Sequence, residues 1–291
     1  MLTFRLAIPF ILTIILTSIF VDEKAVKAVV IGCCILPIIL LGIFKGQIDW
    51  WHYKRYPQVL HPKMQSFIVR FMPYYIALAG ENRTRFEQRM SLLMFSKTYE
   101  KKGMDVVPED LKGWIAANII KLTYGLNDYL FPNFEIIVLY PRKFPSINIK
   151  KFHVSEVFED RSFGGVMFSA EHLMDSLKNQ NQYNLIIHEY ANALWKLNNW
   201  SEKDFLQHVT PQNLQILAKI RGFSLPQVQE YLGKPTLNFF AVVVEHFFYN
   251  PSDFKQYMPE LYSEISTKLN QDPTNKLNPL KFDVVIEEKV S

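Results

Sequence analysis

The 291-residue sequence contains only two cysteines, Cys33 and Cys34, which are adjacent within an apolar run. The rest of the chain has none, so a disulfide framework is excluded there, in agreement with a reducing compartment. Glycine-rich phosphate loops, internal repeats and low-complexity stretches are absent as well. The net charge is +4, and about half of it belongs to residues 1–45. The remaining chain is nearly balanced in charge and gives no electrostatic case for direct nucleic-acid binding.

Two long apolar runs, at residues 6–21 and 29–44, dominate the N-terminal region. Each is near the lower length limit for a helix that spans a bilayer, and the short linker 22–27 suits a transmembrane helical hairpin. The first run could instead be a signal peptide with Arg5 as its charged region, but residues 17–21 offer no clear small-residue cleavage site. The second run would remain as an anchor in either case. We therefore predict a membrane anchor over residues 1–45.

Basic and aromatic residues follow the second apolar run closely. The basic residues are Lys45, Lys54, Arg55 and Lys63, whereas the two lysines of the linker are offset by two acids. The positive-inside rule then places the large domain on the cytoplasmic side of the inner (cytoplasmic) membrane. Aromatic residues within 50–53 are typical of an interfacial belt. Because neither run carries a charge, a transport pathway through the pair is not expected.

Beyond the anchor, apolar periodicity predicts a helix-rich domain. The predicted helices are 82–100, 108–124, 184–197, 211–220, 236–248 and 258–270. Residues 134–140 alternate too little to be amphipathic and end at Pro141, which indicates a buried strand. We therefore expect an α+β fold with a small sheet over residues 46–278, followed by a loose tail at 279–291.

The segment His188-Glu189-Tyr190-Ala191-Asn192 is one residue short of a zinc-protease motif. In H-E-x-x-H, two histidines four residues apart share one helix face and bind one Zn²⁺. The glutamate beside the first histidine then acts as general base on the metal-bound water. Here Asn192 stands where the second histidine belongs. A helix that merely carries one polar pair is the alternative interpretation of this partial motif.

A second candidate, Glu245, lies within the apolar run 239–251. A buried carboxylate must be neutralised, paired or bound to a metal, because an isolated buried charge is costly. In zinc peptidases of the two-His-plus-Glu class, a helix-borne glutamate downstream of the motif is the third ligand. The alternatives are a buried pair with an arginine or lysine, or a direct contact with His188.

Several blocks of the sequence resemble the Mlc titration factor A (MtfA) family of zinc-dependent peptidases. That family carries an H-E-x-A-H-x-L helix, an A-x-x-x-E-x-F-F-x-x-P segment, a P-E-L-Y block and a D-P pair. The corresponding residues here are 188–194, 241–251, 259–262 and 272–273, and upstream blocks at 83–90, 116–126 and 136–144 match the family's order. The resemblance covers roughly residues 70–275 and implies a zincin-like metallopeptidase fold.

Carried over by position, the resemblance implies that His188 is the first zinc ligand, Glu189 the catalytic base and Glu245 the third protein ligand. Asn192 occupies the position of the second ligand. Tyr262 is a candidate for hydrogen-bonding a tetrahedral intermediate, with a packed tyrosine at a helix start as the alternative.

Smaller departures from the family pattern lie near the same residues. Family members tend to have glycine at the position of Ser155 and tryptophan at that of Ala170. The segment 165–169 is expected to be the edge strand beside the cleft. The departures cluster around the site, whereas the other family blocks are present. This pattern is typical of a protein that keeps the fold of its family while its catalytic residues have changed.

The loss of one imidazole should lower zinc affinity by orders of magnitude, because an asparagine carbonyl is a poor, hard ligand for Zn²⁺. Three arrangements stay open. Asn192 could complete a weakened site for a harder ion such as Mn²⁺, or His246, His172 or His208 could supply the missing ligand. In the third, no metal binds, and the Asn192 amide and His188 hydrogen-bond Glu245 directly.

Two functions follow from these alternatives. The first is a membrane-tethered zinc metallopeptidase that hydrolyses peptides through a water activated by Glu189. The second is a pseudopeptidase that keeps the cleft as a binding module. The resemblance makes a regulatory protein the expected partner of that module, since the family's best-known member binds a transcriptional repressor.

Overall fold

The computed structural model describes residues 2–146, 150–160, 164–178, 183–201, 205, 207–224, 226–227, 239–275 and 278–280. It forms two compact units, Met1–Gln58 and Val59–Ser291. Apart from residues 279–280, the predicted loose tail lies outside the described residues, as does the start of the predicted helix 236–248.

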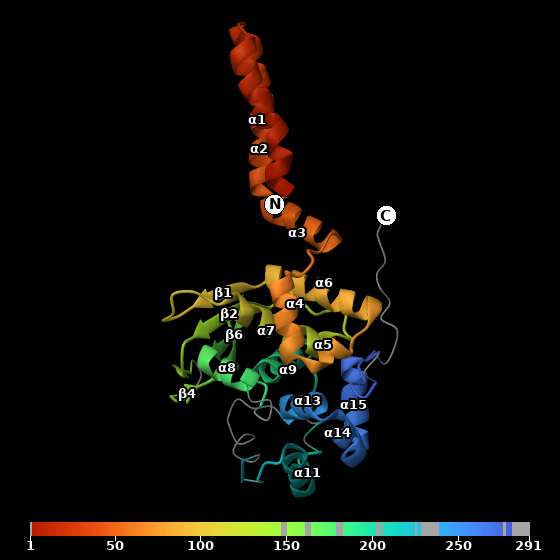
Figure 1. Ribbon diagram of the computed structural model, residues 1–291. Coiled ribbons are helices and arrows are strands. Elements are labelled where there is room, and N and C mark those ends of the chain that lie inside the picture. Colours follow the sequence, from red (N-terminus) through yellow and green to blue (C-terminus); the bar gives the residue numbers. More distant parts are fainter. Residues whose placement is uncertain are drawn as a thin grey trace. The chain divides into compact units, whose positions relative to one another are not determined.

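The first unit is a helical hairpin followed by a short helix. Helices α1 (Leu2–Phe20) and α2 (Lys24–Ile43) run side by side (Figure 1) and are long and apolar enough to cross a membrane. Helix α3 (Lys45–Arg55) packs against both of them. Its Asp49 carboxylate accepts hydrogen bonds from the Thr3 backbone N–H at 3.1 Å and from the Thr3 hydroxyl at 2.8 Å. These two bonds satisfy donors in the first turn of α1, where no helical carbonyl is available.

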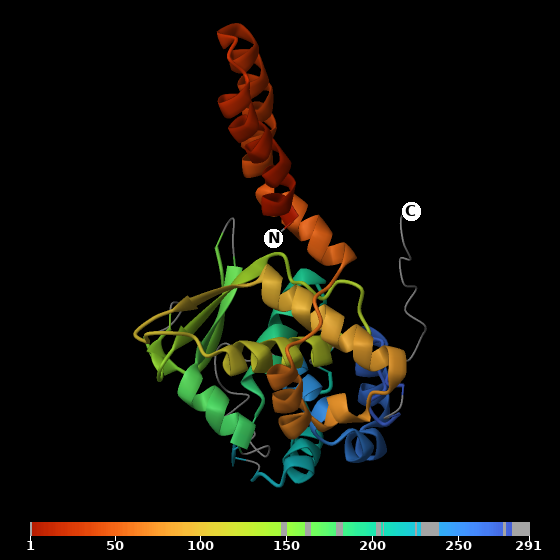
Figure 2. The same cartoon turned by 45° about the horizontal axis from the view of Figure 1, so that its top comes forward.

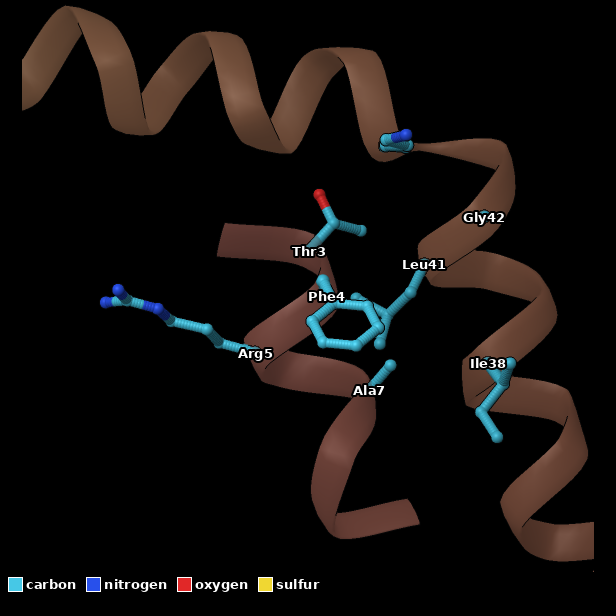
Figure 3. A pocket seen from close by; sticks show the side chains of 8 residues that line it. Thr3, Phe4, Arg5, Ala7, Ile38, Leu41 and Gly42 are labelled. Atoms are coloured by element: carbon cyan, nitrogen blue, oxygen red, sulfur yellow. The ribbon is translucent and has the colours of Figure 1, made fainter. Parts of the chain in front are cut away.

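An open hollow of about 610 Å³ lies between α1 and α2. Figure 3 shows Phe4 and Ala7 of α1 on the side toward Ile38 and Leu41 of α2, whereas Arg5 is directed away from α2. Because most of its walls are apolar, this hollow suits a hydrocarbon chain better than a polar ligand.

A mixed four-stranded sheet lies in the second unit, with strand order β1-β2-β6-β5. Strands β1 (Thr98–Lys101), β2 (Phe134–Tyr140) and β6 (Gly164–Ser169) are parallel, and β5 (Ser155–Glu159) pairs antiparallel with β6. A separate two-stranded sheet joins β3 (Phe144–Pro145) to β4 (Phe152–His153). The predicted small sheet and the buried strand at 134–140 are confirmed.

The expectation that residues 165–169 form the edge strand is wrong. Strand β6 lies between β2 and β5, so the edge of the sheet is β5. Gly165 allows this close packing, because a Cβ atom there would lie 2.5 Å from the Ile136 carbonyl oxygen and equally close to the Phe158 ring.

Helices surround this sheet and form most of the second unit. They are α4 (Pro62–Phe71), α5 (Pro73–Ala77), α6 (Gly80–Ser96), α7 (Glu109–Thr123), α8 (Ala170–Lys178), α9 (Leu185–Leu197), α11 (Pro211–Arg221), α13 (Phe239–Tyr249), α14 (Pro251–Tyr257) and α15 (Pro259–Leu269). The sheet lies at one side of the unit and α14 and α15 at the other, with α7 and α9 between them (Figures 1 and 2).

The core is organised around α9, which packs against α13, α7 and β5. Helix α13 is apolar all round and is buried along residues 239–248, as expected for a helix without a solvent face. Since α9 and α13 carry the candidate site residues, those residues lie inside the core.

The predicted helix 82–100 ends too late. Helix α6 stops at Ser96, and the chain enters β1 at Thr98. The helix ends at Lys97, whose backbone is extended. The buried Lys97 ammonium donates to the backbone carbonyls of Leu130, Phe131 and Phe134 at 2.5–3.0 Å, and these bonds favour the end of the helix at this residue. Tertiary contacts thus override local helix propensity at this point.

Candidate functional site

The first turn of α9 positions His188 and Glu189. Asn184 caps this helix, and its side-chain oxygen accepts from the Ile187 backbone N–H at 3.1 Å. The exposed fractions of His188, Glu189, Asn192 and Glu245 are 2, 7, 8 and 1%. All four side chains are therefore withdrawn from solvent and depend on one another or on their neighbours for hydrogen bonds.

His188 and Glu245 are in direct contact across the α9–α13 interface. The His188 Nδ1 atom lies 2.7 Å from Glu245 Oε1. The other carboxylate oxygen accepts from the Asn184 backbone N–H at 2.8 Å and lies 3.5 Å from Arg221 Nη2. Each oxygen of Glu245 thus has a partner, and cationic or ring N–H groups supply the neutralisation that a buried carboxylate needs.

Glu189 is held by a different set of groups. Its Oε1 accepts from the Ser155 hydroxyl of edge strand β5 at 2.7 Å. The neutral Asn192 side chain, three residues further along α9, also favours the charged form of Glu189 and so lowers its pKa. Burial raises the pKa of Glu189, although His188 and the Ser155 and Asn192 hydrogen bonds act in the opposite direction. No hydrogen bond joins the Asn192 side chain to Glu245 among the described residues, and the buried Asn192 Oδ1 has no hydrogen-bond partner there.

These donors do not fit a three-ligand zinc site. The 2.7 Å contact between His188 Nδ1 and Glu245 Oε1 is a hydrogen bond, so these two side chains form a bonded pair and not two ligands placed around one zinc ion. Within the described part of the chain, no group of three or more His, Cys, Asp or Glu side chains could hold a metal ion. His188 and Glu245 would have to separate, and a third ligand would have to join them.

The other candidate histidines are engaged elsewhere. Both ring nitrogens of His246 lie near backbone carbonyls, at 2.8 and 3.2 Å, and burial lowers its pKa to about 3. The Nδ1 of His172 lies 2.9 Å from the Ser169 hydroxyl, and His208 lies 3.5 Å from a glutamate of α15. None of these contacts brings a second imidazole to His188.

Tyr262 lies on α15 and packs its ring against Phe247 and Phe254. Its hydroxyl donates to Asp272 at 2.5 Å, and burial raises its pKa. These contacts tie α13, α14 and α15 together. They give Tyr262 a packing role, and its role at the site stays a prediction.

Two residues that hold the site were missed in the sequence. Asn184 could have been found, because an asparagine directly before a periodic apolar segment is a helix N-cap signal. Arg221 gives no such signal, since it is an ordinary basic residue in the last turn of α11. Ser155 was noted only as a departure from the family pattern, and its contact with Glu189 depends on the position of β5.

The family suggested by the sequence blocks is confirmed by comparison with known proteins. The model of the family described as glucose-regulated metallo-peptidase M90 matches residues 48–268. The chain is also 24% identical over 251 residues to an uncharacterized protein of Synechocystis, slr2042, covering 77% of this chain and 91% of that protein. The helix-rich domain with its small mixed sheet agrees with the expected zincin-like fold.

Proposed function

The chain belongs to the glucose-regulated metallo-peptidase family M90, and we propose that within this family it is a membrane-attached pseudopeptidase that serves as a protein-binding module. The observation that carries the proposal is the engagement of Glu189 by Ser155 and Asn192. These are two of the positions at which the sequence departs from the family pattern. Ser155 donates a hydrogen bond to the Glu189 carboxylate, and Asn192 favours the charged form of the same group.

The chemistry of a general base supports this interpretation. Such a group must accept a proton from a water that it contacts directly. Glu189 instead accepts from the Ser155 hydroxyl, while His188 and Glu245 contact each other. Both carboxylates are thus engaged by groups of the protein.

Strand β5 supports a binding role for the surface beside these groups. It is an edge strand of the four-stranded sheet, and its first residue, Ser155, donates a hydrogen bond to Glu189. An extended segment of a regulatory protein could add to such an edge through main-chain hydrogen bonds. We propose this edge as the surface on which a partner peptide binds.

Membrane attachment through α1 and α2 is part of the same proposal. Both helices pass the length and hydropathy requirements for a membrane span. The basic residues that follow α2 favour the cytoplasmic side of the inner (cytoplasmic) membrane for the second unit.

A second candidate function is a peptidase with an altered metal site. The observation in its favour is the buried carbonyl oxygen of the Asn192 side chain, Oδ1. This potential metal ligand has no hydrogen-bond partner among the described residues. Carbonyl oxygens suit harder ions such as Mn²⁺ better than zinc.

Metal analysis of the detergent-purified full-length chain separates the two candidates. After exposure to Zn²⁺ or Mn²⁺ and exhaustive dialysis, we expect far less than one equivalent in the native chain and near one equivalent of zinc in Asn192→His. The matched control is Asn198→His, at the exposed C-terminal cap of the same helix, which should behave like the native chain.

Near-stoichiometric metal in the native chain would overturn the pseudopeptidase proposal. It would do so most clearly together with chelator-sensitive peptide hydrolysis that disappears in Glu189→Gln.

A further inference from the structure

A second pocket, of about 430 Å³, lies on the Glu245 side of the α9–α13 pair. We call it the α7–α13 pocket, because Lys121 of α7 and Glu245 and Phe248 of α13 line it together with Arg221 and Tyr74. His188, Glu189 and Asn192 are not among its described lining residues. Its volume is within the range of small-molecule sites, which is about 300–1,000 Å³.

The two cations of the α7–α13 pocket are set in aromatic surroundings. The Arg221 guanidinium lies 4.5 Å from the ring centroid of Tyr183 and 4.3 Å from that of Tyr249. The Lys121 ammonium lies 5.2 Å from the centroid of Phe248 and 5.8 Å from that of Tyr74. Both cations are therefore oriented by aromatic faces, at distances where cation–π attraction operates.

Positive charge exceeds negative charge in this pocket. Glu245 is the carboxylate that lines it, and that group already accepts from His188 and from the Asn184 backbone N–H. Lys121 forms no ion pair with any carboxylate of the described residues. Burial and the nearby Arg221 lower the pKa of Lys121 to about 8. An anionic ligand would relieve this uncompensated charge.

We propose that the α7–α13 pocket binds a small organic carboxylate, with the carboxylate group between Lys121 and Arg221 and an apolar or aromatic body against Tyr74 and Phe248. Arginine holds a planar carboxylate with two parallel N–H donors, and the lysine adds a compact point charge. The same chemistry describes a free aromatic acid and the C-terminal carboxylate of a short peptide. The site goes beyond the proposed function, because it needs neither a metal nor the edge of β5.

Isothermal titration of the detergent-purified full-length chain tests this proposal. The probes are N-acetylphenylalanine, its neutral amide, and the tripeptide Gly-Gly-Phe with a free C-terminus. We expect the acid to bind at least about tenfold more tightly than the amide, since charge-assisted hydrogen bonds are roughly twice as strong as neutral ones. Binding of the tripeptide but not of the free acid would identify a peptide C-terminus as the source of the carboxylate.

Variants on α7 show whether the pocket is the site. Lys121→Met should weaken binding of the acid at least about tenfold, whereas Lys121→Arg, which keeps the charge, should stay within a few-fold of the native chain. The matched control is Lys112→Met on the same helix, whose lysine pairs with Glu109 and does not line the pocket. Equal binding of acid and amide, or equal losses in Lys121→Met and Lys112→Met, would overturn the proposal. These changes leave the buried Arg221 in place. Since Lys121 itself is partly exposed, its substitution should leave the fold intact.

Discussion

Glu189 and Glu245 are both buried carboxylates, but their surroundings differ in charge. Glu245, on α13, contacts His188 and the Arg221 guanidinium, together with a backbone N–H. Glu189, on α9, accepts from the neutral hydroxyl of Ser155, and the neutral Asn192 side chain also favours its charged form. We call the surroundings of Glu245 the charged region and those of Glu189 the neutral region. In a two-His-plus-Glu site, residues of both regions would lie around one metal ion. Here the two carboxylates have separate sets of partners.

The comparison shows two ways in which a protein core stabilises a buried carboxylate. A buried carboxylate is tolerated when cations neutralise it, or when neutral donors replace the water it has lost. Glu245 is stabilised by charge, and Glu189 by neutral polar groups at the two departure positions.

The largest expected effect comes from removing the carboxylate of the charged region. Glu245→Ala leaves His188 and Arg221 buried without their shared acceptor, and breaking a buried pair in this way costs about 3–5 kcal/mol. We expect the melting temperature of the full-length chain to fall by about 10 °C. Differential scanning calorimetry of the native and variant chains measures the shift.

The control for this change is Glu260→Ala, at an exposed position in the first turn of α15. It should alter stability by less than about 1 kcal/mol. Similar losses for Glu245→Ala and Glu260→Ala would mean that the Glu245 contacts contribute little to the fold.

The neutral region should respond less strongly. Ser155→Ala removes one donor from Glu189 and should cost about 1–3 kcal/mol, the usual penalty for an under-satisfied buried group. The exposed Ser263→Ala on α15 serves as the control, with an expected change of about 0.5 kcal/mol or less.

The pH dependence of the Ser155→Ala loss sharpens the contrast. The folded-state pKa of Glu189 is already raised above its ordinary value, and loss of a donor raises it further. A carboxyl with a raised folded pKa favours the fold at low pH, and this contribution is lost as pH rises through the folded pKa. The variant should therefore lose more stability at pH 8 than at pH 4, and the opposite order would contradict the assignment of neutral donors to Glu189.

The smallest effect is expected at a third, partly exposed carboxylate. Burial alone would raise the pKa of Asp272, but hydrogen bonds from Thr274, Tyr262 and Lys255 lower it to about 2. The stabilisation is present above the ordinary value of 3.8 and is lost as pH falls toward 2. Tyr262→Phe should cost about 1 kcal/mol at neutral pH, and the difference in melting temperature should close between pH 4 and pH 2. A difference that does not vary with pH would assign the loss to ring packing instead of the Asp272 bond.

Local sequence signals were sufficient for much of the architecture. Apolar periodicity placed α7, α9, α11 and α15 within a few residues of their observed limits, because each has a buried face and a clear start or stop. The boundary between α6 and β1 was not predictable in this way. It depends on where Lys97 finds backbone carbonyls from a segment more than thirty residues away.

The sequence by itself predicted a buried polar group, from the spacing of His188, Glu189 and Asn192 on one helix and the isolation of Glu245 in an apolar run. It also determined the family, because ordered blocks of residues survive when single site positions change. Only the tertiary structure decided how these groups pair. Hydrogen-bond partners are set by the placement of β5, α11 and the first turn of α9, and differences of less than 1 Å separate a hydrogen bond from a metal-ligand geometry. Periodicity along the chain carries no information at that scale.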